Sequence, residues 1–474
     1  LMEWIIFVIL CLLLWLLPLP FGGNAEWAVL VLEVTIWILF LAYIAVLLPS
    51  KSEVGGRARS TIERAVLWLV ILFFLTGGLQ LIPLPAGLVG TISPAAQSWR
   101  QSLVTVGLFQ PGKFGLQTLS LSPWASAYEL IRYITYGAFV FLLARTLNSR
   151  VRITVLTVTL ISAGVFQSLY GLSEFFGGTN RIFTWVNKYY SGSAFGTFVN
   201  RDHYSAFLEM LFPLSLGYFL VRSEFFSLRP GLNWRQKLAR FGQEHVQKSL
   251  LFIIPPLIIG LGLFFSRCRS GIIIFIVIFF VTLIMLSVSA ESNRPGTEKK
   301  LVRVVVLVVL LAVVLVGIDP VLERFTREGF IDKSRLLFYR HTIQLVSDYP
   351  LTGCGLGTYA QAINYYLPRD PGVIVSHAHN DYLEMLAESG LIGGLSLIIA
   401  GFLAFSLSLR KWLICRNPLA KGVGLGALMG VLAIFMHSLT DFSLRMPGNA
   451  LVWLSLLVLA IKTPAVLEKE EGRP

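Results

Sequence analysis

The chain has 474 residues, of which 55% are hydrophobic and only 14% are charged, and its mean hydropathy is +0.73. Since a soluble domain carries roughly 25% charged residues, this composition excludes an ordinary soluble protein and indicates an integral membrane protein. The formal net charge of +13 has no basic patch with interleaved aromatic residues beside it, which argues against nucleic-acid binding.

Twelve apolar runs are long enough, with their flanks, to cross a membrane, which needs about 20 residues each. They predict an all-α, polytopic fold in which residues 1–474 form a single membrane domain. The first run, Trp4 to Leu17, follows no positively charged segment, so we expect a retained span rather than a cleaved signal peptide. The runs are centred near Leu12, Ile36, Ile71, Ala138, Leu160, Pro213, Leu257, Phe279, Leu311, Ile399, Leu428 and Leu456.

Lysines and arginines concentrate in alternate loops, which predicts the orientation of the chain because basic loops stay in the cytoplasm. With twelve spans, both termini fall on the basic, cytoplasmic side. The long loops at 85–126, 175–203 and 319–379 then lie outside. The basic loops begin at Lys51, Arg145, Arg222, Arg294 and Arg410.

The largest of these outer loops, residues 319–379, has structure of its own. Apolar residues at helical spacing predict a helix from Lys333 to Ser347, and Pro350 disfavours its continuation. Glycines at 353, 355 and 357 then predict a turn with close backbone approach. No strand precedes them, so a dinucleotide-binding fingerprint does not fit.

The end of this loop concentrates titratable side chains at the start of an apolar run. His377, His379 and Asn380 stand there, followed by Asp381 and Glu384. Polar groups at the lip of a membrane helix are costly to retain unless they have a function, and imidazole is suited to act as a general base near neutral pH. Alternatively, His379 and Asn380 cap the helix, and Asp381 with Glu384 forms a capping box.

Six arginines lie on the outer side, where positive charge is disfavoured. Guanidinium groups hold phosphate oxygens bidentately and stay charged in apolar surroundings. The arginines therefore suggest capture of a membrane-borne diphosphate. Alternatively, those of the short hairpin at 266–271 reach lipid head groups, and Arg201 pairs with its neighbour Asp202. The six are Arg201, Arg267, Arg269, Arg335, Arg340 and Arg445.

The remaining titratable residues receive plainer interpretations. His203 and His437 lie near span ends and are more typical of packed or interfacial side chains than of catalytic ones. The four cysteines show no metal-ligand spacing, although Cys268 and Cys354 fall on the same side, where a disulfide could form.

Three segments, in this order and in a twelve-span chain, resemble the bacterial O-antigen ligase and O-antigen polymerase superfamily. The first is residues 196–203, GTFVNRDH. The second runs from Ser334-Arg335 to residues 348–357, DYPLTGCGLG. The third is residues 377–383, HAHNDYL, with ESGL at 388–391.

The resemblance implies a polytopic membrane glycosyltransferase of the bacterial inner membrane. It would transfer a glycan from an undecaprenyl-diphosphate-linked donor to an acceptor hydroxyl at the periplasmic face, without metal or nucleotide cofactor. The acceptor is the lipid A–core for a ligase and another lipid-linked repeat for a polymerase. Histidine before Asn380, namely His379, takes the role of base, and the phosphate role falls to Arg201, Arg335 and one of Arg267 and Arg269.

This sequence departs from the simplest pattern in having His377 and Arg340 as well, so the assignment within each pair stays open. Direct displacement would invert the anomeric carbon, whereas a covalent intermediate would need a nearby carboxylate, for which Asp202, Asp381 and Glu384 are candidates.

A lipid-linked oligosaccharide transporter is the rival function, but it should place its polar residues near the bilayer midplane. A structural partner without catalysis would not need His379 or the arginines. Between ligase and polymerase, the sequence favours the ligase only slightly.

Overall fold

The computed structural model describes residues 1–47, 60–107, 115–222, 251–289, 333–367 and 375–472. Within these ranges the fold is all-α and polytopic, as predicted, with only four two-residue strands. Eight of the described helices are long and apolar enough to cross a membrane, and three further apolar helices, α1, α11 and α12, accompany them. Eleven of the twelve expected spans therefore coincide with helices, and the one centred near Leu311 lies outside the described residues.

The elements occur in the following order. The apolar helices are α1 (Met2–Leu16), α2 (Glu26–Ala42), α3 (Thr61–Leu79), α6 (Pro123–Thr146), α7 (Arg150–Gly177), α8 (Arg201–Arg222), α11 (Ile254–Phe265), α12 (Arg269–Ser289), α17 (Asp381–Ile414), α18 (Pro418–His437) and α19 (Pro447–Glu470). The other helices are α4 (Ala86–Ile92), α5 (Pro94–Thr105), α15 (Lys333–Asp348) and α16 (Tyr359–Ile363). Short turns of helix occupy Phe21–Gly23, Tyr43–Leu47, Leu251–Ile253 and Ser443–Arg445.

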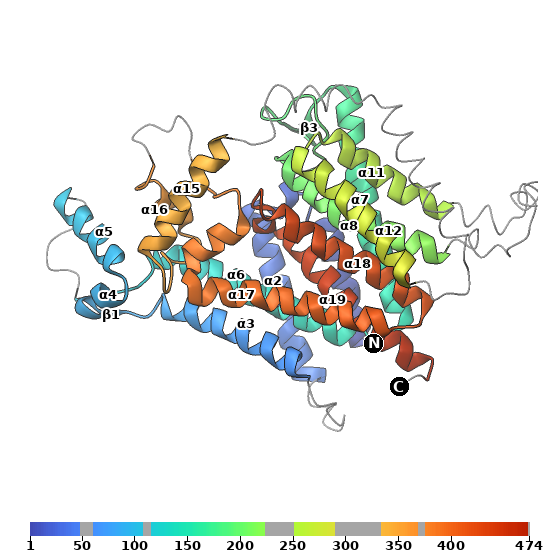
Figure 1. Cartoon of the computed structure of the whole chain (residues 1–474), viewed down its shortest axis with the longest axis horizontal. Helices are drawn as coiled ribbons and strands as arrows, with labels where there is room; N and C mark the ends of the chain where they lie inside the picture. Colours follow the sequence, from blue (N-terminus) through green and yellow to red (C-terminus); the bar gives the residue numbers. More distant parts are fainter. Residues whose placement is uncertain (48–59, 108–114, 223–250, 290–332, 368–374, 473–474) are drawn as a thin grey trace, which may run out of the picture.

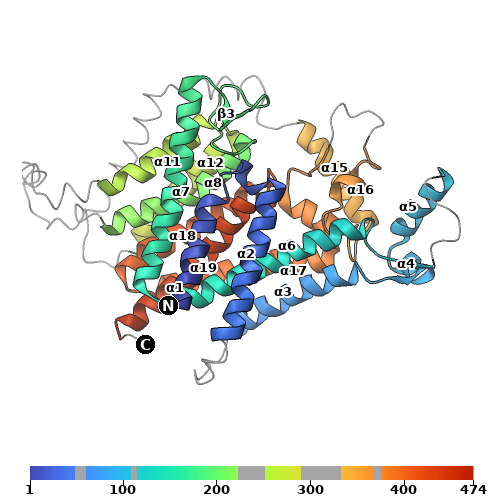
Figure 2. The same ribbon diagram turned by 180° about the vertical axis from the view of Figure 1, so that it is seen from behind.

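Two small antiparallel hairpins complete the fold. Strand β1 (Leu84–Pro85) pairs with β2 (Leu116–Gln117) beside α4, and β3 (Arg181–Ile182) pairs with β4 (Trp185–Val186) after α7. Helices α4, α5, α15 and α16 lie at one end of the helix bundle, and both chain termini lie at the opposite end (Figures 1 and 2).

Helices α8 and α18 pack closely, because glycines remove the side chains between them. A Cβ on Gly217 would come within 2.2 Å of the carbonyl oxygen of Gly422, and a Cβ on Gly426 within 2.5 Å of that of Pro213. Small residues at such contacts let membrane helices approach closely. The pairing brings together the start of α8, at Arg201, and the end of α18, at His437.

Helix α17 is broken at Gly390, whose backbone has φ +67°. The glycine-rich segment after α15 enters this break. Amides of Cys354 and Gly355 donate to the carbonyl oxygens of Ala387 and Glu388 at 2.9 and 3.0 Å. Gly353 has φ +75°, and a Cβ there would meet the backbone of Glu388 at 2.3 Å. The expected turn with close backbone approach is therefore confirmed, and it fixes the loop against the start of the α17 span.

Candidate functional site

His379 is held by a buried carboxylate from the other side of the fold. Its Nδ1 lies 3.0 Å from Oδ1 of Asp441, which is fully buried between α18 and α19. The ring also packs edge-on against Phe442 and the backbone has φ +51°, a conformation uncommon for a non-glycine residue. With Nδ1 donating to the carboxylate, Nε2 is left as the accepting nitrogen, and its ring is 29% exposed. This is the arrangement of an oriented general base.

Asp441 is the centre of the site, because three imidazoles surround it. Its Oδ2 lies 3.4 Å from Nε2 of His203 and 4.0 Å from Nε2 of His437. Burial raises the pKa of the Asp441 carboxyl, but the neighbouring His203, His379 and His437 outweigh it and hold the pKa far below its usual range. Asp441 is thus an anion at neutral pH. Only a weak sequence signal marks Asp441, a lone carboxylate at the end of a span.

Asn380 is the N-cap of α17. Its Oδ1 accepts from the amide of Leu383 at 3.0 Å, and its Nδ2 donates to the carbonyl oxygen of Leu439 at 3.0 Å. The capping box expected from Asp381 and Glu384 is absent from the described cap, since Asp381 instead accepts from the hydroxyl of Ser438 at 2.8 Å. Asn380 therefore fixes the segment that carries His379.

His377 belongs to a second cluster. Its Nδ1 lies 2.9 Å from Oε1 of Glu384, and its ring stacks on Phe442 with centroids 3.9 Å apart. Glu384 also accepts from the amide of Ala378 at 2.8 Å, and its Oε1 forms an ion pair with Nε of Arg445 at 3.2 Å. Burial lowers the pKa of His377, but Glu384 outweighs it, and the pKa is raised overall.

Arg445 is occupied by carboxylates rather than presented to a phosphate. It pairs with Glu388 at 2.6 Å, Glu384 at 3.2 Å and Glu129 at 3.3 Å, and only 10% of its side chain is exposed. Grouping Arg445 with phosphate-binding arginines was therefore wrong in this respect. Sequence spacing could not have revealed it, because Glu129 lies more than 300 positions away.

Arg335 and Arg201 converge on Asp202 at the start of α8. Arg335, on α15, lies 2.9 Å from Asp202 and also donates to the carbonyl oxygen of Thr440, next to Asp441. Arg201 lies over the ring of Tyr190, and its Nε is 3.9 Å from Asp202, too far for a hydrogen bond. That buried Nε has no hydrogen-bond partner among the described residues.

The hairpin arginines lie beside the same end of α8. A Cβ on Gly271, two residues after Arg269, would meet Oγ of Ser205 at 1.9 Å, so α12 begins in contact with α8. Arg267 has φ +54° and lies over the ring of Phe175. Arg340 is different: it is exposed, and five residues from Arg335 it points about 140° away around α15.

The cysteines and acidic residues offer no metal centre in the described ranges. All four cysteines are buried and free, so the disulfide between Cys268 and Cys354 is not formed. No group of three or more histidine, cysteine or acidic side chains suited to a metal ion occurs among the residues described.

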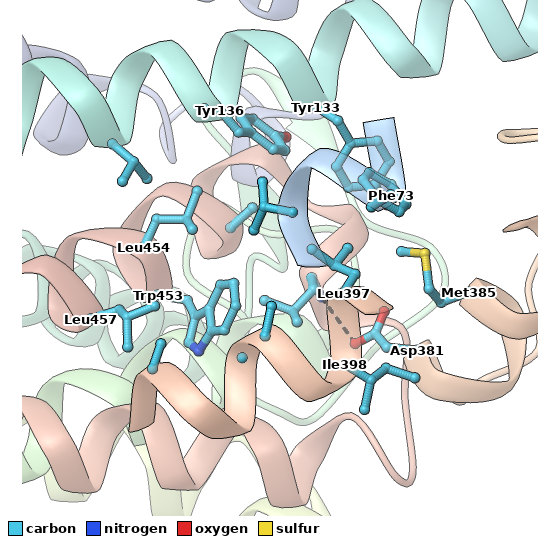
Figure 3. A pocket seen from close by; sticks show the side chains of 18 of the residues that line it. Phe73, Tyr133, Tyr136, Asp381, Met385, Leu397, Ile398, Trp453, Leu454 and Leu457 are labelled. Carbon is cyan, nitrogen blue, oxygen red and sulfur yellow. Dashed lines mark hydrogen bonds between the residues drawn. The ribbon is translucent and has the colours of Figure 1, made fainter. Parts of the chain in front are cut away.

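An apolar cavity of about 370 Å³ lies among α3, α6, α17 and α19, beside the Arg445 cluster. Phe73, Tyr133, Leu397 and Trp453 line it, and Asp381 stands at its polar end, bonded to Ser438 (Figure 3). Its size is that of a ligand pocket, and its lining suits a hydrocarbon chain. The cavity thus joins the membrane-facing helices to the polar site.

Residues 256–398 match a family model described as O-Antigen ligase. The resemblance to the O-antigen ligase and polymerase superfamily is thereby confirmed. The O-antigen ligase segment runs from α11 into α17, and it contains His377, His379 and Arg335. Asp202 and Asp441, which hold Arg335 and His379, lie outside it. No curated protein matches the chain.

Proposed function

We propose that this multi-pass membrane protein transfers a glycan from an undecaprenyl-diphosphate-linked donor to an acceptor hydroxyl, as an O-antigen ligase. The family match supports a function of the ligase or polymerase type. The observation that carries the proposal is the His379–Asp441 pair, which leaves Nε2 of His379 able to accept a proton, while Arg335 binds the carbonyl oxygen of Thr440 next to Asp441.

In this reaction, Nε2 of His379 takes the proton of the acceptor hydroxyl as its oxygen attacks the anomeric carbon. The bond between that carbon and the diphosphate oxygen breaks, and undecaprenyl diphosphate leaves with the electron pair. Asp441 stabilises the imidazolium that forms. Arg201 and Arg335, with one of Arg267 and Arg269, would neutralise the departing diphosphate, which lowers the barrier without a metal ion.

The state of the carboxylates favours direct displacement with inversion. Asp202 is paired with Arg335, Glu384 with His377 and Arg445, and Asp381 accepts from Ser438. A covalent intermediate would need one of them to leave its partners and reach the sugar. The apolar cavity beside the cluster offers room for the hydrocarbon chain of a lipid-linked substrate.

The location of the site supports an enzyme rather than a transporter. Arg335 on α15 and His379 just before α17 both contact the segment 440–441, and α15 lies at the end of the bundle opposite the termini (Figure 1). In our proposal this end faces the periplasm, the protein lies in the bacterial inner membrane, both termini are cytoplasmic, and residues 319–379 form the large periplasmic loop. A transporter would place such groups near the midplane.

The decisive experiment is reconstitution with a lipid-linked glycan, offering lipid A–core and lipid-linked repeats as competing acceptors. We expect transfer to lipid A–core, and a loss of two orders of magnitude or more for His379→Ala with the donor still bound. Transfer to lipid-linked repeats alone would instead assign the alternative, an O-antigen or exopolysaccharide polymerase. Near-normal turnover of a folded His379→Ala protein would overturn the mechanism.

A further inference from the structure

A second, deeper pair of charged side chains lies behind Asp441. His437, the last residue of α18, is fully buried, and its Nδ1 lies 3.1 Å from both carboxylate oxygens of Glu209 on α8. Glu209 is 1% exposed and also accepts from the hydroxyl of Ser205 at 2.8 Å. The close contact of α8 and α18 through their glycines is what brings this histidine and this glutamate together.

The other nitrogen of His437 is directed toward the site. Its Nε2 lies 4.0 Å from Oδ2 of Asp441, and that nitrogen has no hydrogen-bond partner among the described residues. Nε2 of His203 is likewise unpartnered there and lies 3.4 Å from the same oxygen. Two buried imidazole nitrogens therefore face one carboxylate oxygen, whose companion oxygen binds His379.

A proton on His437 reduces the net negative charge of this group. Asp441 and Glu209 are two buried carboxylates that face opposite nitrogens of the His437 ring, and like charges that share a buried site disfavour each other's ionisation unless a cation separates them. His437 stands between them. Arg335 is already paired with Asp202, and His377, which stacks on Phe442, is paired with Glu384. With His437 charged, the group has a net charge of −1, which His379 neutralises when it accepts a proton.

We propose that His437, held by Glu209, is a positioning residue for transfer: it keeps Asp441 ionised and therefore keeps His379 with its proton on Nδ1 and its Nε2 able to act as base. The inference rests on the proposed function, in which His379 is the base. A purely structural role explains less, since a buried ion pair is often no more stabilising than apolar residues of similar size.

The test uses three variants of the full chain reconstituted with donor and acceptor. In His437→Gln the amide keeps a partner for Glu209 but carries no charge, so Glu209 and Asp441 compete and one takes up a proton. We expect kcat to fall about tenfold to 100-fold while the KM for the donor changes less than about threefold. Glu209→Gln should also lower kcat. The positive charge of His437 then acts on Asp441 alone, so Asp441 stabilises the imidazolium of His379 less.

The double variant Glu209→Gln/His437→Gln removes both charges and leaves Asp441 as the single buried anion. We expect its kcat to exceed that of His437→Gln by about tenfold, a rescue that lost packing would not produce. His341→Gln is the matched control, since the hydrogen bond of His341 within the described residues goes to Gln344 on the same helix, and the kcat of this variant should stay at the wild-type value. Thermal unfolding in detergent checks folding.

Wild-type kcat in a folded His437→Gln protein would overturn the proposal, as would a double variant no faster than the single one. Where His437→Gln does not fold, the double variant decides: a kcat within about tenfold of wild type supports the proposal, and a larger loss overturns it. Failure of the proposed function looks different, because the wild-type protein itself would then show no transfer.

Discussion

Nδ1 of His379 lies 3.0 Å from the buried carboxylate of Asp441, although the two residues are 62 positions apart in the chain. Asp441→Asn keeps the shape of this side chain but lets an amide face Nδ1, which favours the tautomer with the proton on Nε2. We expect kcat to fall by about 10²–10⁴-fold with little change in donor binding. Steady-state kinetics of the reconstituted protein measures this, and a kcat within threefold of wild type would contradict the assigned role.

Arg201 is the arginine best placed to accept a new anionic partner, because its buried Nε lacks a hydrogen bond among the described residues. Arg201→Lys replaces a planar fork by a point charge, so we expect affinity for an undecaprenyl-diphosphate analogue to fall about tenfold. Arg201→Ala should cost about 2–5 kcal/mol of binding free energy. Exposed Arg340→Lys is the matched control and should bind as wild type does. Unchanged affinity in both Arg201 variants would move the phosphate site elsewhere.

The ion pair between His377 and Glu384 should make stability depend on pH. The pKa of His377 is raised above its ordinary value of 6.5 in the folded protein. Its contribution to the free energy of unfolding is therefore fully present below pH 6.5 and is lost as the pH rises through the raised pKa. The wild-type protein should exceed His377→Gln in thermal stability most at pH 5.5–6, with the difference shrinking toward pH 8.5. A difference that grows with pH would show that the pair is not an ion pair of this kind.

Gly353 should tolerate no side chain, since it has φ +75° and its Cβ position lies 2.3 Å from the backbone of Glu388. We expect Gly353→Ala to lower the free energy of unfolding by about 2–4 kcal/mol and to impair transfer by loosening the start of α17. Gly87→Ala on α4 is the control, because nothing lies within 4 Å of its Cβ position. Denaturation of both variants side by side tests the difference, and equal stabilities would contradict the close packing of Gly353 against Glu388.

The proposed orientation can be tested on residues that the structure shows to be exposed. A cysteine at Asn364, after α16, should react with an impermeant thiol reagent in intact spheroplasts, whereas one at Lys469, near the end of α19, should not. The four native cysteines are buried, so the background should be low. Labelling of the second position but not the first would reverse the topology.

The sequence predicted the parts of this fold that are encoded locally. Hydropathy located the spans, helical spacing and Pro350 located α15, and the polar segment before α17 located His379 and Asn380. Local patterns also misled, since Asp381 and Glu384 have the spacing of a capping box, yet Ser438, His377 and Arg445 take their carboxylates.

Contacts between residues far apart in the sequence could not be predicted. Glu209 and His437 meet although they are 228 positions apart, because glycines let α8 and α18 touch. Nothing in the residues around either one indicates the other. For the same reason, the sequence around Arg445 does not indicate that Glu129, Glu384 and Glu388 surround its guanidinium group.

The site draws its side chains from α8, α15, the start of α17 and the segment after α18, so it spans residues from Arg201 to Arg445. During synthesis, His379 leaves the ribosome well before Asp441 and His437 do. The nascent chain therefore holds its histidine segment without the carboxylate that orients it, and the proposed chemistry must wait until α18 has been inserted and has packed on α8. A chain truncated before that helix would be inert, however well its earlier spans were embedded.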